Sequence, residues 1–261
     1  MNNKLVLGIE YDGSAYCGWQ RQIHCTSVQA ELEKALSFVA NEPIELFCAG
    51  RTDSGVHACE QVAHFETTVE RSNRSWVLGA NCRLPRDIRI LWVQPSGSDF
   101  HARFSAVARS YRYIILNTLI PSALFHNKVC WEHRQLNADI MHDAAQQLTG
   151  EHDFSAFRAA GCQAHSPVRT IQYLNISRKE EVIYLDIKAN AFLHHMVRNI
   201  AGSLMAIGQG QYPEHWLTDV LVSGDRRLAA KTASAAGLYF VRAFYPESFK
   251  LPQLERKPVL F

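Results

Sequence analysis

The sequence lacks the features that would place the chain in a membrane or outside the cell. Over its 261 residues no apolar run reaches the roughly 20 residues that a helical membrane span needs. The N-terminal residues 1–4 lead directly into an expected strand, without the apolar segment and cleavage site of a signal peptide. We therefore expect a cytoplasmic protein that makes no contact with a membrane.

The cysteine and histidine patterns do not support a metal site. The seven cysteines are an odd number and include no Cys-x-x-Cys pair, which argues against both a disulfide framework and a zinc site. Of the twelve histidines only His194 and His195 are adjacent. Neighbours on a helix point about 100° apart, so this pair could not clamp one ion as an i, i+4 pair does. We expect no metal.

What the chain does contain is enough apolar sequence for a folded core. Apolar residues make up 47% and charged residues 20% of the composition, which excludes a disordered protein. The formal net charge of +2 is weakly basic and neither requires nor excludes RNA as a partner.

Hydrophobic periodicity predicts an α+β protein of two ferredoxin-like (RRM-like) halves, each in the order β-α-β-β-α-β. In the first half we predict a helix that begins at a capping box, Thr26-x-x-Gln29, and in the second a helix capped by Asn137 and closed by Gly150. The strands are expected at 5–11, 44–49, 61–66, 88–92, 111–115, 170–177, 182–189 and 238–244, and the helices at 28–40, 72–82, 137–150, 196–208 and, as an extra segment, 216–222. The predicted halves are 1–105 and 106–261, with a cleft between them that the second half completes.

The ten residues 49–58, Ala-Gly-Arg-Thr-Asp-Ser-Gly-Val-His-Ala, lie between two of these strands. Read without further context they are a turn, because Asp bonds to its own backbone and Gly accepts a positive φ. The functional alternative is that Arg51 and Asp53 are held tightly at the end of a sheet, where a positioned carboxylate could act on a substrate.

The segment Gly50–His57 resembles the signature of the tRNA pseudouridine synthase A family, in which the Asp is catalytic. Other segments resemble that family as well, in order along nearly the whole chain: 10–13 with 18–22, 100–105, 109–113, 190–199 and 236–238. The resemblance implies isomerisation of uridine to pseudouridine at positions 38, 39 and 40 of the tRNA anticodon stem-loop. It also implies a homodimer, the extrusion of the target base, and no cofactor. The reaction has no net redox change and no group donor, so it needs neither nicotinamide nor metal.

By resemblance Asp53 is the catalytic residue, and it could attack C1′, attack the uracil ring or remove the C2′ proton. Arg198 is the better charge partner for this carboxylate, and Arg51 is better placed to fill the space that an extruded uridine leaves. Tyr111 could stack on the base, and Leu238 could press against it.

Two segments are candidate tRNA contacts. The first interleaves aromatic and cationic side chains, a mixture that stacks on bases and meets phosphates, and it consists of Phe100, His101, Ala102, Arg103 and Phe104. The second lies in an expected loop flanked by Arg158 and Arg169, and it consists of Gly161, Cys162, Gln163, Ala164 and His165. The chain ends in a Pro-containing apolar segment, 251–261, for which the sequence suggests no role.

Two other functions fit parts of the sequence. A non-catalytic RNA-binding protein or RNA chaperone could use the same cleft, but Asp53 with two candidate arginine partners favours catalysis. A cofactor-free hydrolase could be built on Asp186 with His194 and His195, but no Ser or Cys lies in a nucleophile-elbow context.

Overall fold

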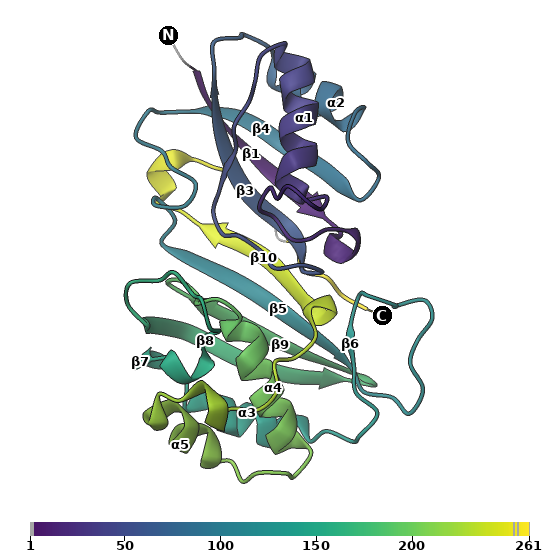
Figure 1. Ribbon diagram of the computed structural model, residues 1–261, viewed down its shortest axis with the longest axis vertical. Coiled ribbons are helices and arrows are strands. Elements are labelled where there is room, and N and C mark those ends of the chain that lie inside the picture. Colours follow the sequence, from purple (N-terminus) through teal and green to yellow (C-terminus); the bar gives the residue numbers. More distant parts are fainter. Residues whose placement is uncertain (1–2, 253, 255, 261) are drawn as a thin grey trace. The chain divides into compact units, whose positions relative to one another are not determined.

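The computed structural model describes residues 3–252, 254 and 256–260, which form an α+β protein of two compact units (Figure 1). Unit 1 comprises Met1–Val107 with Tyr239–Pro258, and unit 2 comprises Ala108–Leu238 with Val259–Phe261. Residues 239–258, which we expected in the second half, therefore belong to unit 1. The reason is that β10 (Leu238–Phe244) pairs in parallel with β3 (His57–Thr67), so that Tyr239 lies opposite His57 and Phe240 opposite Ala58.

Unit 1 has the strand order β4-β1-β3, with β2 also paired to β3, and all of these pairings are antiparallel. This order, with α1 and α2 in the connections, confirms the ferredoxin-like prediction for the first half. The elements are β1 (Asn3–Tyr11), α1 (Val28–Ala40), β2 (Phe47–Cys48), β3 (His57–Thr67), α2 (Asn73–Asn81), β4 (Ile88–Ser96) and β10 (Leu238–Phe244), with 3-10 turns η1 (Gly13–Ala15) and η5 (Glu247–Phe249).

Helix α1 has the predicted bounds but not the predicted cap. Ser27, with extended backbone, is the N-cap and accepts from the Ala30 N–H at 3.4 Å. The predicted capping box from Thr26 to Gln29 is wrong, because the Gln29 amide instead donates to the Leu46 carbonyl at 3.2 Å. The helix thereby anchors the segment that leads into β2.

Strand β3 is buried on both faces over nearly its whole length. On one face Phe65 contacts Trp76 of α2 edge-on, with ring centroids 5.2 Å apart. On the other face Glu60 accepts from the Trp92 indole at 2.9 Å, next to a pocket of about 270 Å³. Burial raises the pKa of Glu60.

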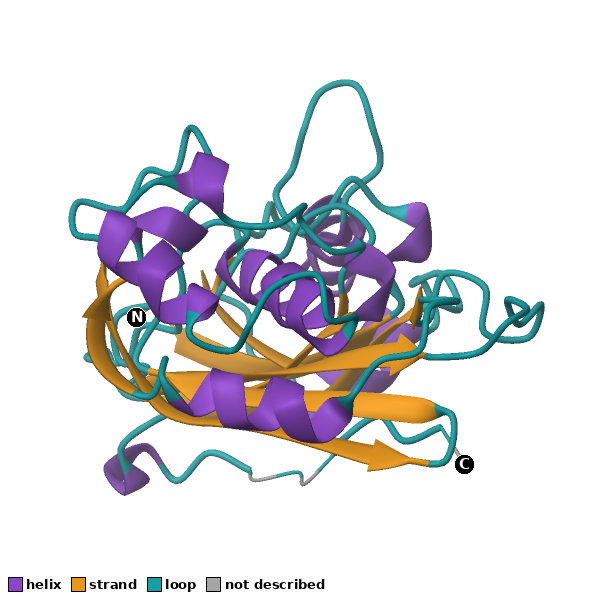
Figure 2. Cartoon of the chain, turned by 90° about the horizontal axis from the view of Figure 1, so that it is seen from below, coloured by secondary structure: helices purple, strands orange, loops and turns teal. Residues whose placement is uncertain are grey.

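The C-terminal segment covers this second face and thereby gains a structural role. Lys250 helps to line the pocket, and its carbonyl accepts from the Gln94 amide at 3.4 Å. Further along, Arg256 forms an ion pair with Glu10 at 3.4 Å. Figure 2 draws the segment as a loop with one helical turn, η5. Residues 253, 255 and 261 of the predicted tail lie outside the described residues.

Unit 2 has the strand order β5-β9-β8-β7 with antiparallel neighbours, and β6 pairs parallel with β5. The elements are β5 (Ala108–Leu116), β6 (Cys130–Trp131), α3 (Ala138–Gln146), β7 (Gly150–Asp153), β8 (Val168–Lys179), β9 (Val182–Ala189), α4 (Met196–Gly208) and α5 (Trp216–Ser223), with 3-10 turns η2 (Ser155–Phe157), η3 (Arg226–Leu228) and η4 (Ala235–Gly237).

One detail of the second half agrees with the prediction and two differ. Asn137 does cap α3, accepting from the N–H groups of Asp139 and Ile140. Gly150 does not close that helix, because α3 ends at Gln146 and Gly150 begins the unpredicted strand β7. His194 and His195 precede α4, so the helical spacing that was assumed in excluding this pair as metal ligands does not apply to it. In the part of the chain that is described, every helix is too short or too polar to cross a bilayer.

A disulfide joins Cys17 and Cys25, eight residues apart, in the connection between β1 and α1. This corrects the expectation drawn from the odd cysteine count, which excluded a framework but could not exclude one local bridge. The other five cysteines, at positions 48, 59, 82, 130 and 162, are thiols. Closure of a loop of this length stabilises a fold by about 2–3 kcal/mol in the chain-entropy model.

We expect denatured, unreduced protein to take up five alkylating groups, and reduced protein seven, as measured by intact mass. Cys25→Ser should lower the melting temperature, because it removes the bridge, while Cys82→Ser, which changes an exposed thiol, should leave it unchanged. Seven groups on unreduced protein would show that the bridge does not form.

Candidate active site

The loop of residues 49–56 joins β2 to β3 and is fixed by main-chain hydrogen bonds. At its start the Ala49 N–H donates to the Val62 carbonyl at 2.8 Å. Towards its end the Val56 N–H donates to the Asp53 carbonyl at 3.1 Å, which closes a turn at Asp53. The turn expected from the sequence is therefore present, and the candidate carboxylate lies within it.

Thr52, the residue before Asp53, is buried and held from two sides. The Tyr11 hydroxyl, at the end of β1, shares a hydrogen bond of 2.7 Å with Thr52 Oγ1. The Thr52 carbonyl accepts from the Trp19 N–H at 3.0 Å. Tyr11 and Trp19 are themselves buried, so the segment between them fixes the backbone from which the Asp53 side chain projects.

Gly18 allows the two segments to approach at backbone distance. A Cβ at this position would lie 2.6 Å from the Thr52 carbonyl oxygen and 3.0 Å from the carbonyl carbon of Asp53. Its φ of +89° is also in the region that favours glycine. Any other residue would therefore push the Asp53 backbone away or strain its own.

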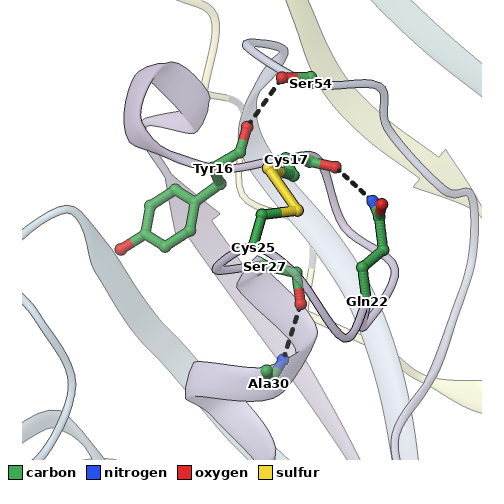
Figure 3. The surroundings of a disulfide bond; sticks show 7 residues. All are labelled: Tyr16, Cys17, Gln22, Cys25, Ser27, Ala30 and Ser54. Atoms are coloured by element: carbon green, nitrogen blue, oxygen red, sulfur yellow. Dashed lines mark hydrogen bonds between the residues drawn. A yellow bond between two sulfur atoms is a disulfide. The ribbon is translucent and has the colours of Figure 1, made fainter.

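The residues after Asp53 are held by Tyr16. Its carbonyl accepts from the Ser54 hydroxyl at 3.1 Å and from the Gly55 N–H at 3.4 Å. Cys17 follows Tyr16 directly, and Figure 3 shows its disulfide beside the hydrogen bond to Ser54. The bridge and the contacts to the Asp53 loop therefore lie in one short segment.

Within the loop the Asp53 side chain is half-buried and Arg51 is exposed. Arg51 lies near Cys48, at the end of β2. Burial raises the pKa of the Cys48 thiol to about 12, and the charges of Arg51 and Arg103 oppose this rise. Two cations are therefore grouped near the start of the loop. A partly exposed carboxylate on a rigid loop, with cations close by, suits a reaction on an anionic substrate.

The candidate contact segment 100–104 is divided between the core and the surface of unit 1. The side chains of Phe100 and Ala102 are fully buried. His101 is half-buried, and Arg103 and Phe104 are exposed. A contact of this segment with RNA would therefore involve the side chains of these last three residues.

The candidate residues of unit 2 have different surroundings. Tyr111 on β5 is 9% exposed and meets Phe192 edge-on, with centroids 4.9 Å apart. Arg198 on α4 is half-buried, and its Nε donates to the Ala233 carbonyl at 2.9 Å. Leu238 is buried; it is the first residue of β10, whose remaining residues belong to unit 1. Their predicted substrate-binding roles stay predictions.

The second candidate contact segment, 161–165, is a loop in which Gly161, Gln163 and His165 are exposed. Arg158, which the sequence suggested as a flanking cation, holds this loop by donating to the carbonyls of Cys162 and Ala164. The guanidinium of Arg158 thus has a structural use within unit 2.

Asp186, the carboxylate of the alternative hydrolase, is committed to an ion pair. Arg112 donates to both of its oxygens, at 2.8 Å and 2.7 Å. A bidentate pair of this kind fixes the carboxylate and lowers its availability as a base or nucleophile. The geometry therefore argues against Asp186 as a reacting group.

Sequence reasoning assigned no role to the residues that hold Asp53, namely Tyr11, Tyr16, Gly18, Trp19 and Thr52. A signal was present, because Tyr11, Gly18 and Trp19 lie in segments that resemble the same family as the loop does. The structure explains why these segments occur together: residues 11–19 support the loop that contains Asp53.

We expect Gly18→Ala to destabilise the protein and reduce its activity, because the new Cβ would displace the backbone at Thr52. Gly210→Ala is the matched control, since Gly210 also has a positive φ (+73°) but has no atom within 4 Å of the added Cβ. The control should cost about 1 kcal/mol of unfolding free energy, the ordinary cost of a left-handed backbone, and Gly18→Ala clearly more. Equal losses in urea unfolding would contradict the close contact.

Comparisons with known proteins agree with the resemblance noted from the sequence. A family model described as tRNA pseudouridine synthase matches residues 8–105 and 144–246. The chain is similar to proteins named tRNA pseudouridine synthase A from Hydrogenovibrio crunogenus (58% identity, 96% of this chain and 95% of that protein) and Photobacterium profundum (54% identity, 98% of each). A third, from Actinobacillus pleuropneumoniae serotype 3, is 56% identical over 98% of each chain. The chain belongs to the tRNA pseudouridine synthase family.

Proposed function

We propose that the chain isomerises uridine to pseudouridine at positions 38, 39 and 40 of the tRNA anticodon stem-loop, with Asp53 as its essential catalytic residue and without a cofactor. The observation that carries the proposal is the rigid support of Asp53. The loop that contains Asp53 is hydrogen-bonded to β3. Thr52 and Ser54, which flank Asp53 in the sequence, are held by residues 11–19. A carboxylate fixed in this way suits a reaction that needs one group close to the sugar of a bound nucleotide.

Four other residues would bind the target uridine or support the catalytic carboxylate. Arg51 is exposed next to Asp53, which suits insertion into the space that an extruded uridine leaves. We assign Arg198 as the charge partner of the catalytic carboxylate, Tyr111 as the residue that stacks on the uracil, and Leu238 as a contact to the base. The reaction needs neither an electron carrier nor a group donor, which is why no cofactor enters the proposal.

Affinity for tRNA would come from the exposed members of the two contact segments. Arg103 can meet a phosphate, while Phe104 and His101 offer ring surfaces. Gln163 and His165 would make the second contact. By resemblance we also propose a homodimer that acts in the cytoplasm.

Asp53→Asn should abolish turnover while tRNA affinity stays within a few-fold, because the substitution preserves shape and removes the reactive charge. We expect a rate loss of at least ~10³ in pseudouridine formation on tRNA transcripts. Asp99→Asn, at an exposed carboxylate of the same unit, is the control and should keep the wild-type rate. Multiple turnover by the Asp53 variant would refute the assignment.

Arg103→Ala should weaken tRNA binding and make it less sensitive to salt. Each phosphate contact releases counterions, so loss of one should reduce the slope of log affinity against log salt by about one. Arg227, which is 89% exposed and already paired with Asp225 at 2.6 Å, provides the control substitution Arg227→Ala. If both variants keep the wild-type slope in filter-binding titrations, Arg103 makes no phosphate contact.

A further inference from the structure

Four rings of unit 1 form a continuous cluster, which we call the aromatic platform: Phe47, His64, His101 and Phe104. Phe47 of β2 lies directly opposite His64 of β3, and their rings stack with centroids 5.3 Å apart and planes 27° apart. His64 meets His101 at 4.6 Å, and His101 meets Phe104 at 4.4 Å. Phe47 also approaches His101, at 5.9 Å.

The platform is buried at its centre and open at its ends. His64 is only 4% exposed, and its Nδ1 accepts from the Ala102 N–H at 3.2 Å, which fixes the ring. Phe47 and Phe104 are 44% and 75% exposed. Two large apolar rings at the surface, mounted on fixed buried groups, are typical of a binding surface.

The rings of the platform carry no charge at neutral pH. Burial, together with the charges of His101 and Lys4, lowers the pKa of His64 to about 4. Burial, with Lys4 and Arg103, also lowers the pKa of His101. Both shifts favour the neutral imidazole, so the platform is an uncharged π surface at pH 7.

Cations border this neutral surface. The Arg103 guanidinium lies 5.5 Å from the centre of the Phe104 ring. Arg51 and Arg103 both act on Cys48, the residue after Phe47. A ligand that covers the rings must therefore have a flat π face and negative charge beside it. An apolar protein segment would bring no group that these two positive charges attract, whereas an unpaired nucleotide brings both a flat base and a phosphate.

Phe47 also lies close to the proposed reacting group along the chain. Phe47 precedes Asp53 by six positions, which limits their Cα separation to about 20 Å even for extended chain.

We propose that Phe47, backed by His64 and His101, stacks on an unpaired base of the tRNA that flanks the target uridine. The inference rests on the proposed function, from which it takes the tRNA, but it assigns to this site a residue that the contact segments do not include. Phe47 thereby acts as a binding and positioning residue and takes no part in the chemistry. Phe104 and Arg103 extend the same surface toward the adjoining phosphate.

The test compares Phe47→Leu with Phe38→Leu. Phe38, on α1, is 60% exposed and lies under the Arg83 guanidinium at 3.6 Å, so it matches Phe47 in residue type, exposure and a nearby cation. Stacking on an aromatic side chain is worth enough to expect at least about a five-fold rise in tRNA Kd for Phe47→Leu. The slope of log affinity against log salt should not change, because no charge is removed. Phe47→Trp should restore affinity, and Phe38→Leu should bind as the wild type does.

Transcripts with one abasic site each, placed in turn around the target uridine, locate the partner. The abasic substitution at the contacted base and Phe47→Leu should not be additive, since both remove the same stack. All variants are first compared by thermal melting, so that a folding defect is recognised. Wild-type affinity of Phe47→Leu, or additivity at every position, overturns the inference. A change of oligomeric state with unchanged tRNA affinity would also overturn it and assign the platform to a protein interface.

The outcome for the proposed function is read separately, on wild-type protein. Pseudouridine formed by the wild type, with no effect of Phe47→Leu, leaves the function standing and removes only the stacking residue. If the wild type forms no pseudouridine in tRNA, the proposed function fails first, and the inference falls with it.

Discussion

The placement of Asp53 depends on main-chain contacts between two loops, and the most restrictive of these is the approach of Gly18 to the backbone at Thr52. A catalytic carboxylate must be held to within about half an ångström of its working position, although loops are the most mobile parts of a fold. Here the hydrogen bonds of Tyr16 and Trp19 hold the loop on either side of Asp53 without contacting its carboxylate. These bonds thus fix the Asp53 backbone and use none of its side-chain atoms.

This support is in turn fixed by the burial of β3 on both faces. Phe65 packs toward α2 on one face, and on the other Glu60 is covered by the C-terminal segment. Movement of either end of the Asp53 loop would require this strand to leave its neighbours, which exposes apolar surface on two sides. The C-terminal segment, which is distant in sequence, therefore contributes to the rigidity of the site from beneath the sheet.

Much of this fold could be predicted where the pattern is local and periodic. The bounds of β9, α4 and β10 agree with the sequence because their apolar residues alternate or recur at helical spacing without interruption. The short strands β6 and β7 were missed, since two to four residues carry no period. The assignment of residues 239–258 to unit 1 also escaped prediction, because pairing of β10 with β3 joins residues about 180 positions apart and leaves no local trace.

In the candidate site, too, sequence motifs identify some of the residues, whereas others are brought together only by the fold. From the sequence, Phe100 to Phe104 form one mixture of rings and cations, but the structure turns Phe100 into the core and Phe104 to the surface. The exposed ring of Phe104 is part of the aromatic platform. The other exposed member, Phe47, lies in none of the motifs, and its pairing with His64 across the strands places it there. A cross-strand neighbour is set by register, so a residue can enter a binding surface without any signal in its own segment. Site residues that no motif marks should therefore be looked for among the cross-strand partners of the buried residues that support the motif.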